Sequence, residues 1–209
     1  AAMARPQFSD PNADYQQMPW QDYAIVRFGR STAYPQAHYV TSAQTKNTVR
    51  AFEQIRAKGY QRVGFAGDSS KTKTFHGGAS IAQEYVPAEW RIPNLLFGPT
   101  DDAPARIANL AAWLKQWKPE AVYTDNADMP DYLKTLGIRV PQDLGLATTS
   151  IHDTPIDSGM NQNPEEIGRT AVRNLVSLLN EQEYGIPPIR TEILVEGTWV
   201  DGTMLPEKK

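Results

Sequence analysis

The chain has no cysteine and only three histidines in 209 residues. Without thiols it cannot form disulfide bonds, thiolate metal sites or a cysteine nucleophile, which suits a reducing cytoplasm. No apolar run approaches the length needed to cross a membrane. The formal net charge of -3 gives no overall attraction to nucleic acid or to an anionic membrane. We therefore expect a cytoplasmic domain with no membrane partner that is not itself a DNA-binding module.

Strand-like and helix-like patterns alternate along the chain. Strands are predicted at 23–28, 38–41, 62–66, 92–97, 121–124, 144–148 and 191–200. Apolar residues at helical spacing predict helices over 44–58, 75–87, 103–117, 128–136 and 164–183, the last with Asn163 as its N-cap. The alternation predicts an α/β fold, a parallel sheet with crossover helices on both faces. Residues 1–22 contain three prolines and predict an irregular lead-in.

Ligands of such sheets bind beyond the carboxyl ends of the strands. This rule selects the loops Gly67–His76, Asp125–Asp128 and Ser150–Asp153, and the region around Gly29 and Arg30. These loops are therefore the first places to look for a site.

Familiar chemical motifs are incomplete. The segment GFAGDSSKT, residues 64–72, lacks the glycines of a phosphate-binding loop, because Phe65 and Ser70 occupy their places. The segment DNADMPD, residues 125–131, has Pro130 where a calcium loop needs glycine, so its aspartates are better explained as a helix cap and an acidic first turn. We predict no metal and no cofactor.

Ser150, His152 and Asp153 are residue types of a hydrolase triad, but they lie within four residues of one another. A triad needs its members to converge in space, and side chains this close in sequence rarely align as nucleophile, base and orienter. An α/β enzyme is therefore the least favoured of the functions considered.

Three segments, taken in order, resemble the LacI/GalR family of transcription regulators. They are GIRVPQDLGLATTS at 137–150, HYVTSAQTKNTVRAFEQIRAKGYQRVGFAG at 38–67 and the C-terminal stretch at 160–203 with its NPEEIGRTAV helix. The resemblance covers roughly residues 23 to 204. Any one motif is moderately specific, but three at the right spacing are strong.

The resemblance implies the effector-binding domain of such a regulator, with the periplasmic-binding-protein-like fold of two Rossmann-like α/β lobes. Nothing in the sequence matches the family's helix-turn-helix or the start of its N-terminal lobe, so this lobe is expected to be incomplete, as in a fragment of a longer regulator. The expected division is 23–40 with 164–183 in the remnant of the N-terminal lobe, and 41–160 with 189–202 in the C-terminal lobe.

The resemblance also implies the positions of a small-molecule effector site in the cleft between the lobes. Residue by residue, the counterparts are Arg30, Thr74, Asp125, Asn126, Ser150, His152 and Gln162. The sequence departs from the family at three of its usual polar positions. Thr74 or Phe75 stands where the family has arginine, and Ser150 and Ala43 stand where it has aspartates. A sugar or sugar derivative is the implied class of effector.

The implied function is a homodimeric, non-enzymatic regulator in which the effector shifts the affinity of separate DNA-binding heads for a symmetric operator. The alternative is a solute-binding protein of a transporter, which has the same fold but no DNA partner. The segment G-x-x-V-P-x-D at 137–143 favours the regulator.

Overall fold

The computed structural model describes residues 18–29, 34–69 and 73–208. The chain divides into two compact units, a smaller one of Ala1–Ser42 and Asn163–Val195 and a larger one of Ala43–Gln162 and Glu196–Lys209. Candidate residue Arg30 lies outside the described residues, as does most of the predicted lead-in; Trp20–Asp22 form a 3₁₀ helix (η2).

The larger unit is built on a six-stranded sheet with the order β4-β3-β5-β6-β7-β9. Its strands pair in parallel except for the last, because β7 and β9 run antiparallel. The strands are β3 (Val63–Asp68), β4 (Leu95–Phe97), β5 (Ala121–Thr124), β6 (Gly145–Thr148), β7 (Gly159–Asn161) and β9 (Thr198–Val200). The predicted parallel α/β sheet is confirmed.

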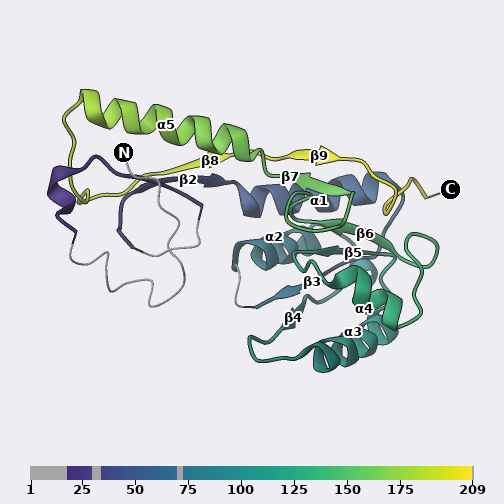
Figure 1. Cartoon of the computed structure of the whole chain (residues 1–209). Coiled ribbons are helices and arrows are strands. Elements are labelled where there is room, and N and C mark those ends of the chain that lie inside the picture. Colours follow the sequence, from purple (N-terminus) through teal and green to yellow (C-terminus); the bar gives the residue numbers. More distant parts are fainter. Residues whose placement is uncertain (1–17, 30–33, 70–72, 209) are drawn as a thin grey trace. The chain divides into compact units, whose positions relative to one another are not determined.

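Helices cover both faces of this sheet (Figure 1). They are α1 (Gln44–Ala57), α2 (Lys73–Glu84), α3 (Ala103–Trp117) and α4 (Met129–Thr135), with a 3₁₀ turn η3 (Ala88–Trp90). Phe52 of α1 and Ala79 of α2 pack on Phe65 and Tyr123 in one core cluster. Trp113 of α3 belongs to the cluster on the opposite face. Alternate residues of β3 and β5 therefore supply two separate cores, as the period of a strand dictates.

The smaller unit consists of the parallel sheet β1-β2-β8 and one long helix. Its elements are β1 (Val26–Phe28), β2 (His38–Ser42), β8 (Glu192–Val195) and α5 (Pro164–Asn180). Ala171 and Leu178 of α5 are buried, whereas Val172, Val176 and Leu179 are about half exposed. The helix thus has a second apolar stripe that the described part of the chain leaves in solvent.

The segment predicted as one strand over 191–200 is two strands in different units. β8 pairs with β2 of the smaller unit, and β9 pairs with β7 of the larger one. The expected lobe boundary at 189 differs accordingly, because the division falls between Val195 and Glu196. Gly197 separates the strands, and its N–H donates to Asn47 Oδ1 at 2.9 Å. A side chain there would collide with Asn47, so this crossing requires glycine.

Asn163 does not cap α5 as predicted. It adopts the left-handed conformation (φ 54°, ψ 57°) and its side chain makes no capping hydrogen bond. Asparagine tolerates this conformation better than most residues, so its role is to turn the chain into the helix. Pro164 at the first helical position agrees with the prediction.

The last residues form a segment that we call the C-terminal strap, residues 203–208. Asp157 accepts hydrogen bonds from the backbone N–H groups of Thr203 and Met204. Leu205 is fully buried, and Tyr60 donates through its hydroxyl to the carbonyl of Pro206. Lys208 pairs with Glu120, which also accepts from the N–H groups of Gln61 and Arg62. The strap thus ties the chain end to the amino end of the sheet.

Glu120 should make stability depend on pH. Burial alone raises the pKa of its carboxyl, but the hydrogen bonds from Lys208, Arg62 and Gln61 outweigh burial, so the net pKa lies below the usual 4.5. A depressed acid contributes stability above its unfolded pKa and loses it as the pH falls through the folded value. We expect the difference in unfolding free energy between wild type and Glu120→Gln to be largest above about pH 5 and to shrink in more acidic solution. Urea titrations across that range measure it, and a difference independent of pH would contradict this assignment.

Candidate functional site

The order of the strands places a topological switch point at the carboxyl ends of β3 and β5. From β3 the chain moves outward to β4, then returns to the other side of β3 to form β5 and continues to β6. The loops after β3 and β5 therefore depart in opposite directions, which is the switch point where open α/β sheets bind ligands. The candidate residues after β3, β5, β6 and β7 belong to this edge.

Asp125 ties the two central strands together. Its Oδ1 accepts a hydrogen bond of 3.0 Å from the backbone N–H of Asp68, the last residue of β3. A Cβ at Gly67 would lie 2.3 Å from the same oxygen, so glycine is needed for this approach. Asp125 is therefore held in place at the switch point by the fold.

Asn126 is the most informative candidate. It is 4% exposed, its Oδ1 accepts from the N–H of Asp128 at 2.8 Å, and its own N–H donates to Thr124 Oγ1. Asn126, a predicted cap of this helix, closes a turn directly before α4. Its Nδ2 is buried and has no hydrogen-bond partner among the described residues. A buried amide nitrogen left unpaired costs stability, so it calls for a partner that the described residues do not supply.

Ser150 and Gln162 follow β6 and β7, the two strands that come after β5 in the sheet. Gln162 donates through Nε2 to the carbonyl of Thr149 at 3.0 Å, and the N–H of Thr149 donates to the carbonyl of Thr124. Ser150 is buried, and its N–H donates to Thr148 Oγ1. These bonds place both candidates along the same sheet edge as Asn126.

Thr74 and His152 have different surroundings. The hydroxyl of Thr74 donates to Gln44 Oε1 and its carbonyl accepts from the hydroxyl of Thr45, so it links the first turns of α1 and α2. His152 is exposed in a turn where the N–H of Asp153 donates to the carbonyl of Ser150. The segment is therefore a tight turn in which Ser150 is buried and His152 is exposed.

Two residues that the sequence did not single out complete the edge. Asp68 is 8% exposed, and its Oδ2 lies 3.5 Å from Arg106 Nη2 on α3. The end-of-strand rule selects the loop that begins at Gly67 and so includes the position of Asp68. Nothing in the sequence pairs it with an arginine inside an amphipathic helix. Over the residues that the structure describes, no three histidine, aspartate or glutamate side chains gather as they would to hold a metal ion.

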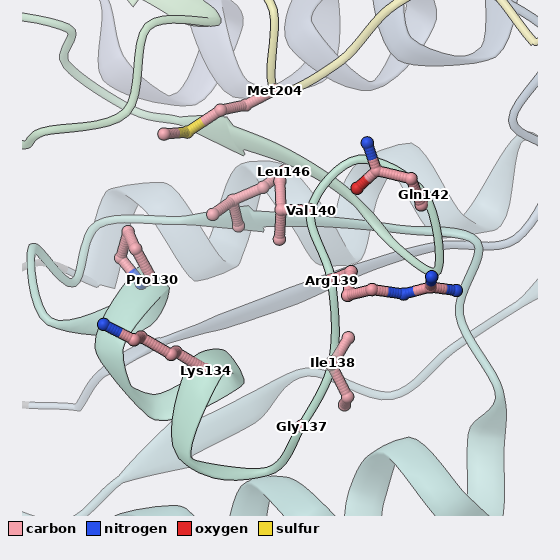
Figure 2. Close-up of a pocket in the computed structure, with 9 residues that line it drawn as sticks. All are labelled: Pro130, Lys134, Gly137, Ile138, Arg139, Val140, Gln142, Leu146 and Met204. Carbon is pink, nitrogen blue, oxygen red and sulfur yellow. The ribbon is translucent and has the colours of Figure 1, made fainter.

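An open hollow of about 450 Å³ lies elsewhere in the larger unit, at the amino end of β6 (Figure 2). Its lining is Pro130, Lys134, Gly137, Ile138, Arg139, Val140, Gln142, Leu146 and Met204. Asp143, the aspartate of the V-P-x-D segment, stabilises the loop beside this hollow. It accepts two hydrogen bonds from the Arg139 guanidinium, and these lower the pKa of Asp143 to about 2. None of the predicted site residues lines this hollow, so the candidate site is the carboxyl edge of the sheet.

Helices of the described segments give no sign of a membrane span, since none is both long enough and apolar enough. A comparison with curated protein sequences gives no significant match. Solved structures with a similar fold are numerous, and many of them are transcription regulators.

A transcription regulator-like protein from Staphylococcus haemolyticus is 16% identical with a TM-score of 0.60, over 87% of this chain and 66% of that one. A LacI family regulator from Enterococcus faecium with bound ribose is 14% identical with a TM-score of 0.62, over 88% and 71%. A probable maltose operon repressor from Staphylococcus aureus is 11% identical with a TM-score of 0.67, over 96% and 74%. Identities this low show a shared fold, and this chain spans only part of each structure.

The periplasmic binding protein-like domain family matches residues 52–201, which is most of the chain and includes the sheet with its candidate edge. The predicted periplasmic-binding-protein-like fold is thereby confirmed. The chain belongs to the family of periplasmic binding protein-like domains.

Proposed function

We propose that this chain is the ligand-sensing domain of a LacI/GalR-type transcription regulator and that its effector is a small hydroxylated molecule. The observation that carries the proposal is the buried Nδ2 of Asn126 at the switch point of the sheet, which pairs with none of the residues that the structure describes. Three of the similar structures hold ribose, cellobiose and D-xylulofuranose, so a sugar or sugar derivative is the class to test first.

The proposed action is a shift of population. An effector that binds one arrangement of the domain more tightly favours this arrangement, and separate DNA-binding heads then sit differently on a symmetric operator. The net charge of -3 agrees with DNA contacts made outside this chain. A homodimer, a cytoplasmic location and the absence of catalysis belong to the same proposal. A monomer of the full-length regulator in light scattering would count against the dimer.

The direct test is a thermal-shift panel of neutral sugars, sugar acids and nucleobases. A ligand that binds only the folded state raises the melting temperature by mass action. At a hundred times its Kd, the ligand adds about 2.7 kcal/mol of stability. If no compound in the panel raises the melting temperature at millimolar concentration, the proposal of a small hydroxylated effector fails.

Asn126→Asp separates binding from folding. The new carboxylate still accepts from the N–H of Asp128, so the turn before α4 is kept, but the donor is lost and a charge is added. We expect at least a tenfold loss of affinity for any ligand found, about 1.4 kcal/mol, with little change in apo stability. Gln142→Glu makes the same chemical change in the separate hollow and should bind normally. Equal effects of the two variants would mean that Asn126 is not a ligand contact.

Gln162→Ala gives a second comparison along the same edge. Its Nε2 donates to the carbonyl of Thr149, so the variant loses one structural bond as well as a candidate contact. If Gln162 contacts ligand, affinity falls more than apo stability, whereas equal losses in both would assign it a structural role.

A solute-binding protein of a transporter is the second candidate, favoured by the family that matches residues 52–201. The coding sequence upstream of this chain discriminates between them. A helix-turn-helix there supports the regulator, and a secretion signal supports the transporter.

A further inference from the structure

The open hollow at the amino end of β6 has an apolar floor. Leu146 of β6 is fully buried, and Val140 and Met204 pack on the core cluster that includes Trp113 of α3. The volume of about 450 Å³ lies in the range of small-molecule sites. All of the lining residues belong to the larger unit. The hollow therefore has the size and the apolar surface that the body of a small organic ligand requires.

The walls of the hollow are held by hydrogen bonds that need no ligand. Asp143 accepts from the backbone N–H of Arg139 and, through both carboxylate oxygens, from its guanidinium. The N–H of Asp143 in turn donates to the carbonyl of Arg139. The carbonyl of Met204 accepts from the N–H of Leu146, and the N–H of Met204 donates to Asp157. A site whose walls are fixed in advance loses little conformational entropy when a ligand binds.

The charges around the hollow favour an anion. Its lining contains Lys134 and Arg139 but no aspartate or glutamate. Bonds of 2.7 and 2.8 Å to Asp143 already neutralise the guanidinium of Arg139. The side chain of Lys134 makes no hydrogen bond or ion pair with any residue that the structure describes, and Asp131, three residues earlier on α4, does not line the hollow. Lys134 is therefore a cation whose charge a ligand can match.

The polar groups of the rim stand on either side of the apolar floor. Lys134 follows Pro130 by one turn on α4, and Figure 2 shows it across the hollow from Gln142, with Leu146 and Val140 between them. Lys134 and Gln142 are both exposed, and the amide of Gln142 has no hydrogen-bond partner within the described part of the chain. An ammonium group pairs with a carboxylate, and an amide can donate to it as well. A ligand with a carboxylate at one end would thus meet a cation at the rim and apolar side chains beneath.

We propose that this hollow binds a small amphipathic carboxylic acid, with its carboxylate at Lys134 and its apolar body on Leu146, Val140 and Met204. The site is separate from the proposed effector site, and neither depends on the other. A neutral sugar suits the hollow poorly, because its hydroxyls would lose water against apolar side chains.

The test compares acids with neutral alcohols of the same shape. Calorimetry on the whole chain would use octanoate with octanol, and hydrocinnamate with hydrocinnamyl alcohol. We expect one molecule of either acid to bind per chain at millimolar concentration, more tightly than its alcohol does. Lys134→Gln should weaken the binding of the acids roughly three- to fivefold, as the loss of one exposed ion pair does, and leave the alcohols unchanged. Lys134→Arg keeps the charge and should bind as the wild type does.

A control variant and a second measurement locate the ligand. Lys115 of α3 is also an exposed lysine, has no ion pair with a described residue and lies outside the hollow, so Lys115→Gln should change no affinity. In methyl NMR spectra, the Met204 resonance should move on titration with either acid. The resonance of Met160, fully buried in the core cluster of α1 and α2, should stay in place.

The outcomes are distinct. Tighter binding of the acids, its loss in Lys134→Gln and movement of the Met204 resonance together support the inference. Acids that bind no more tightly than their alcohols, or equally to the Lys134→Gln and Lys115→Gln variants, overturn the role of the carboxylate. Absence of binding, or binding that leaves the Met204 resonance unmoved, overturns the site itself. A Met204 resonance that moves with protein concentration alone would mean that a second copy covers the hollow, which also overturns it.

These results leave the effector site untouched. The thermal-shift panel and Asn126→Asp test that site through different ligands and a different residue, so each proposal can fail alone.

Discussion

Gly159→Ala is expected to cost roughly 3 kcal/mol or more of unfolding free energy, because a methyl group has no room at this position. The residue has φ +147°, and an added Cβ would lie 2.2 Å from the carbonyl oxygen and 2.7 Å from the nitrogen of Thr148. Both atoms belong to the backbone of β6, so no side chain can move to relieve the contact. Gly159 also pairs with Val200 of β9. Substitution should therefore displace β7 and β9 together.

Denaturant unfolding followed by tryptophan fluorescence measures this loss, since Trp199 of β9 packs against the core. Gly77→Ala is the matched control, because a Cβ at Gly77 of α2 would meet no atom within 4 Å. Alanine in a helix interior is favoured over glycine by up to about 1 kcal/mol, so this control should be neutral or stabilising. If both variants unfold at the same denaturant concentration, the close approach of β6 and β7 is wrong.

Leu205→Ala should destabilise the larger unit by about 3 kcal/mol, within the usual range for a buried leucine. Leu205 is fully buried in the core that α1 and α2 cover, and its Cδ1 would lie 2.6 Å from a Cβ at Gly145. The cavity left by truncation is bordered by the first residue of β6 and by Tyr60, so it cannot close without moving the sheet. The strap would then lose its only fully buried side chain among the described residues 203–208.

Leu96→Ala removes the same atoms from a leucine that is 39% exposed, and it should cost less than about 1 kcal/mol. Because both variants lose the same atoms, the difference in their stability measures the effect of burial. If the two leucine variants lose similar stability, the C-terminal strap does not belong to the core. A truncation after Gly202 should be at least as destabilising as Leu205→Ala, because it also removes the hydrogen bonds of Thr203 to Asp157 and the ion pair of Lys208 with Glu120.

The periodicity of apolar residues was enough to predict the helices and strands that are long or strongly apolar. The helix predicted over 103–117 is α3 with the same bounds, and the apolar runs at 62–66 and 121–124 are buried strands. β7 was missed because Gly-Met-Asn has no β-branched or alternating pattern, and it is held by pairing with β6 and β9. A strand of three residues is defined by its neighbours, which local propensity does not describe.

In the candidate site, too, some residues were predictable from the sequence and others were not. The end-of-strand rule and the family resemblance both pointed to Asp125 and Asn126, and the structure places them at the switch point beside Asp68. Their role in binding stays a proposal. Asp68 and Arg106 are 38 positions apart in sequence, and Arg106 has the pattern of an ordinary charge on an amphipathic helix. Long-range pairs of this kind leave no periodic signal.

The amino-acid order alone was sufficient for the α/β class, the main helices and strands and the family, because each depends on spacing within short segments. Folding settled which strands are neighbours, where the chain passes from one unit to the other and which polar side chains meet at the sheet edge. Those outcomes depend on contacts between distant segments, such as Gly197 with Asn47 and Gly67 with Asp125. Such contacts stabilise the fold only once the sheet has brought the distant segments together.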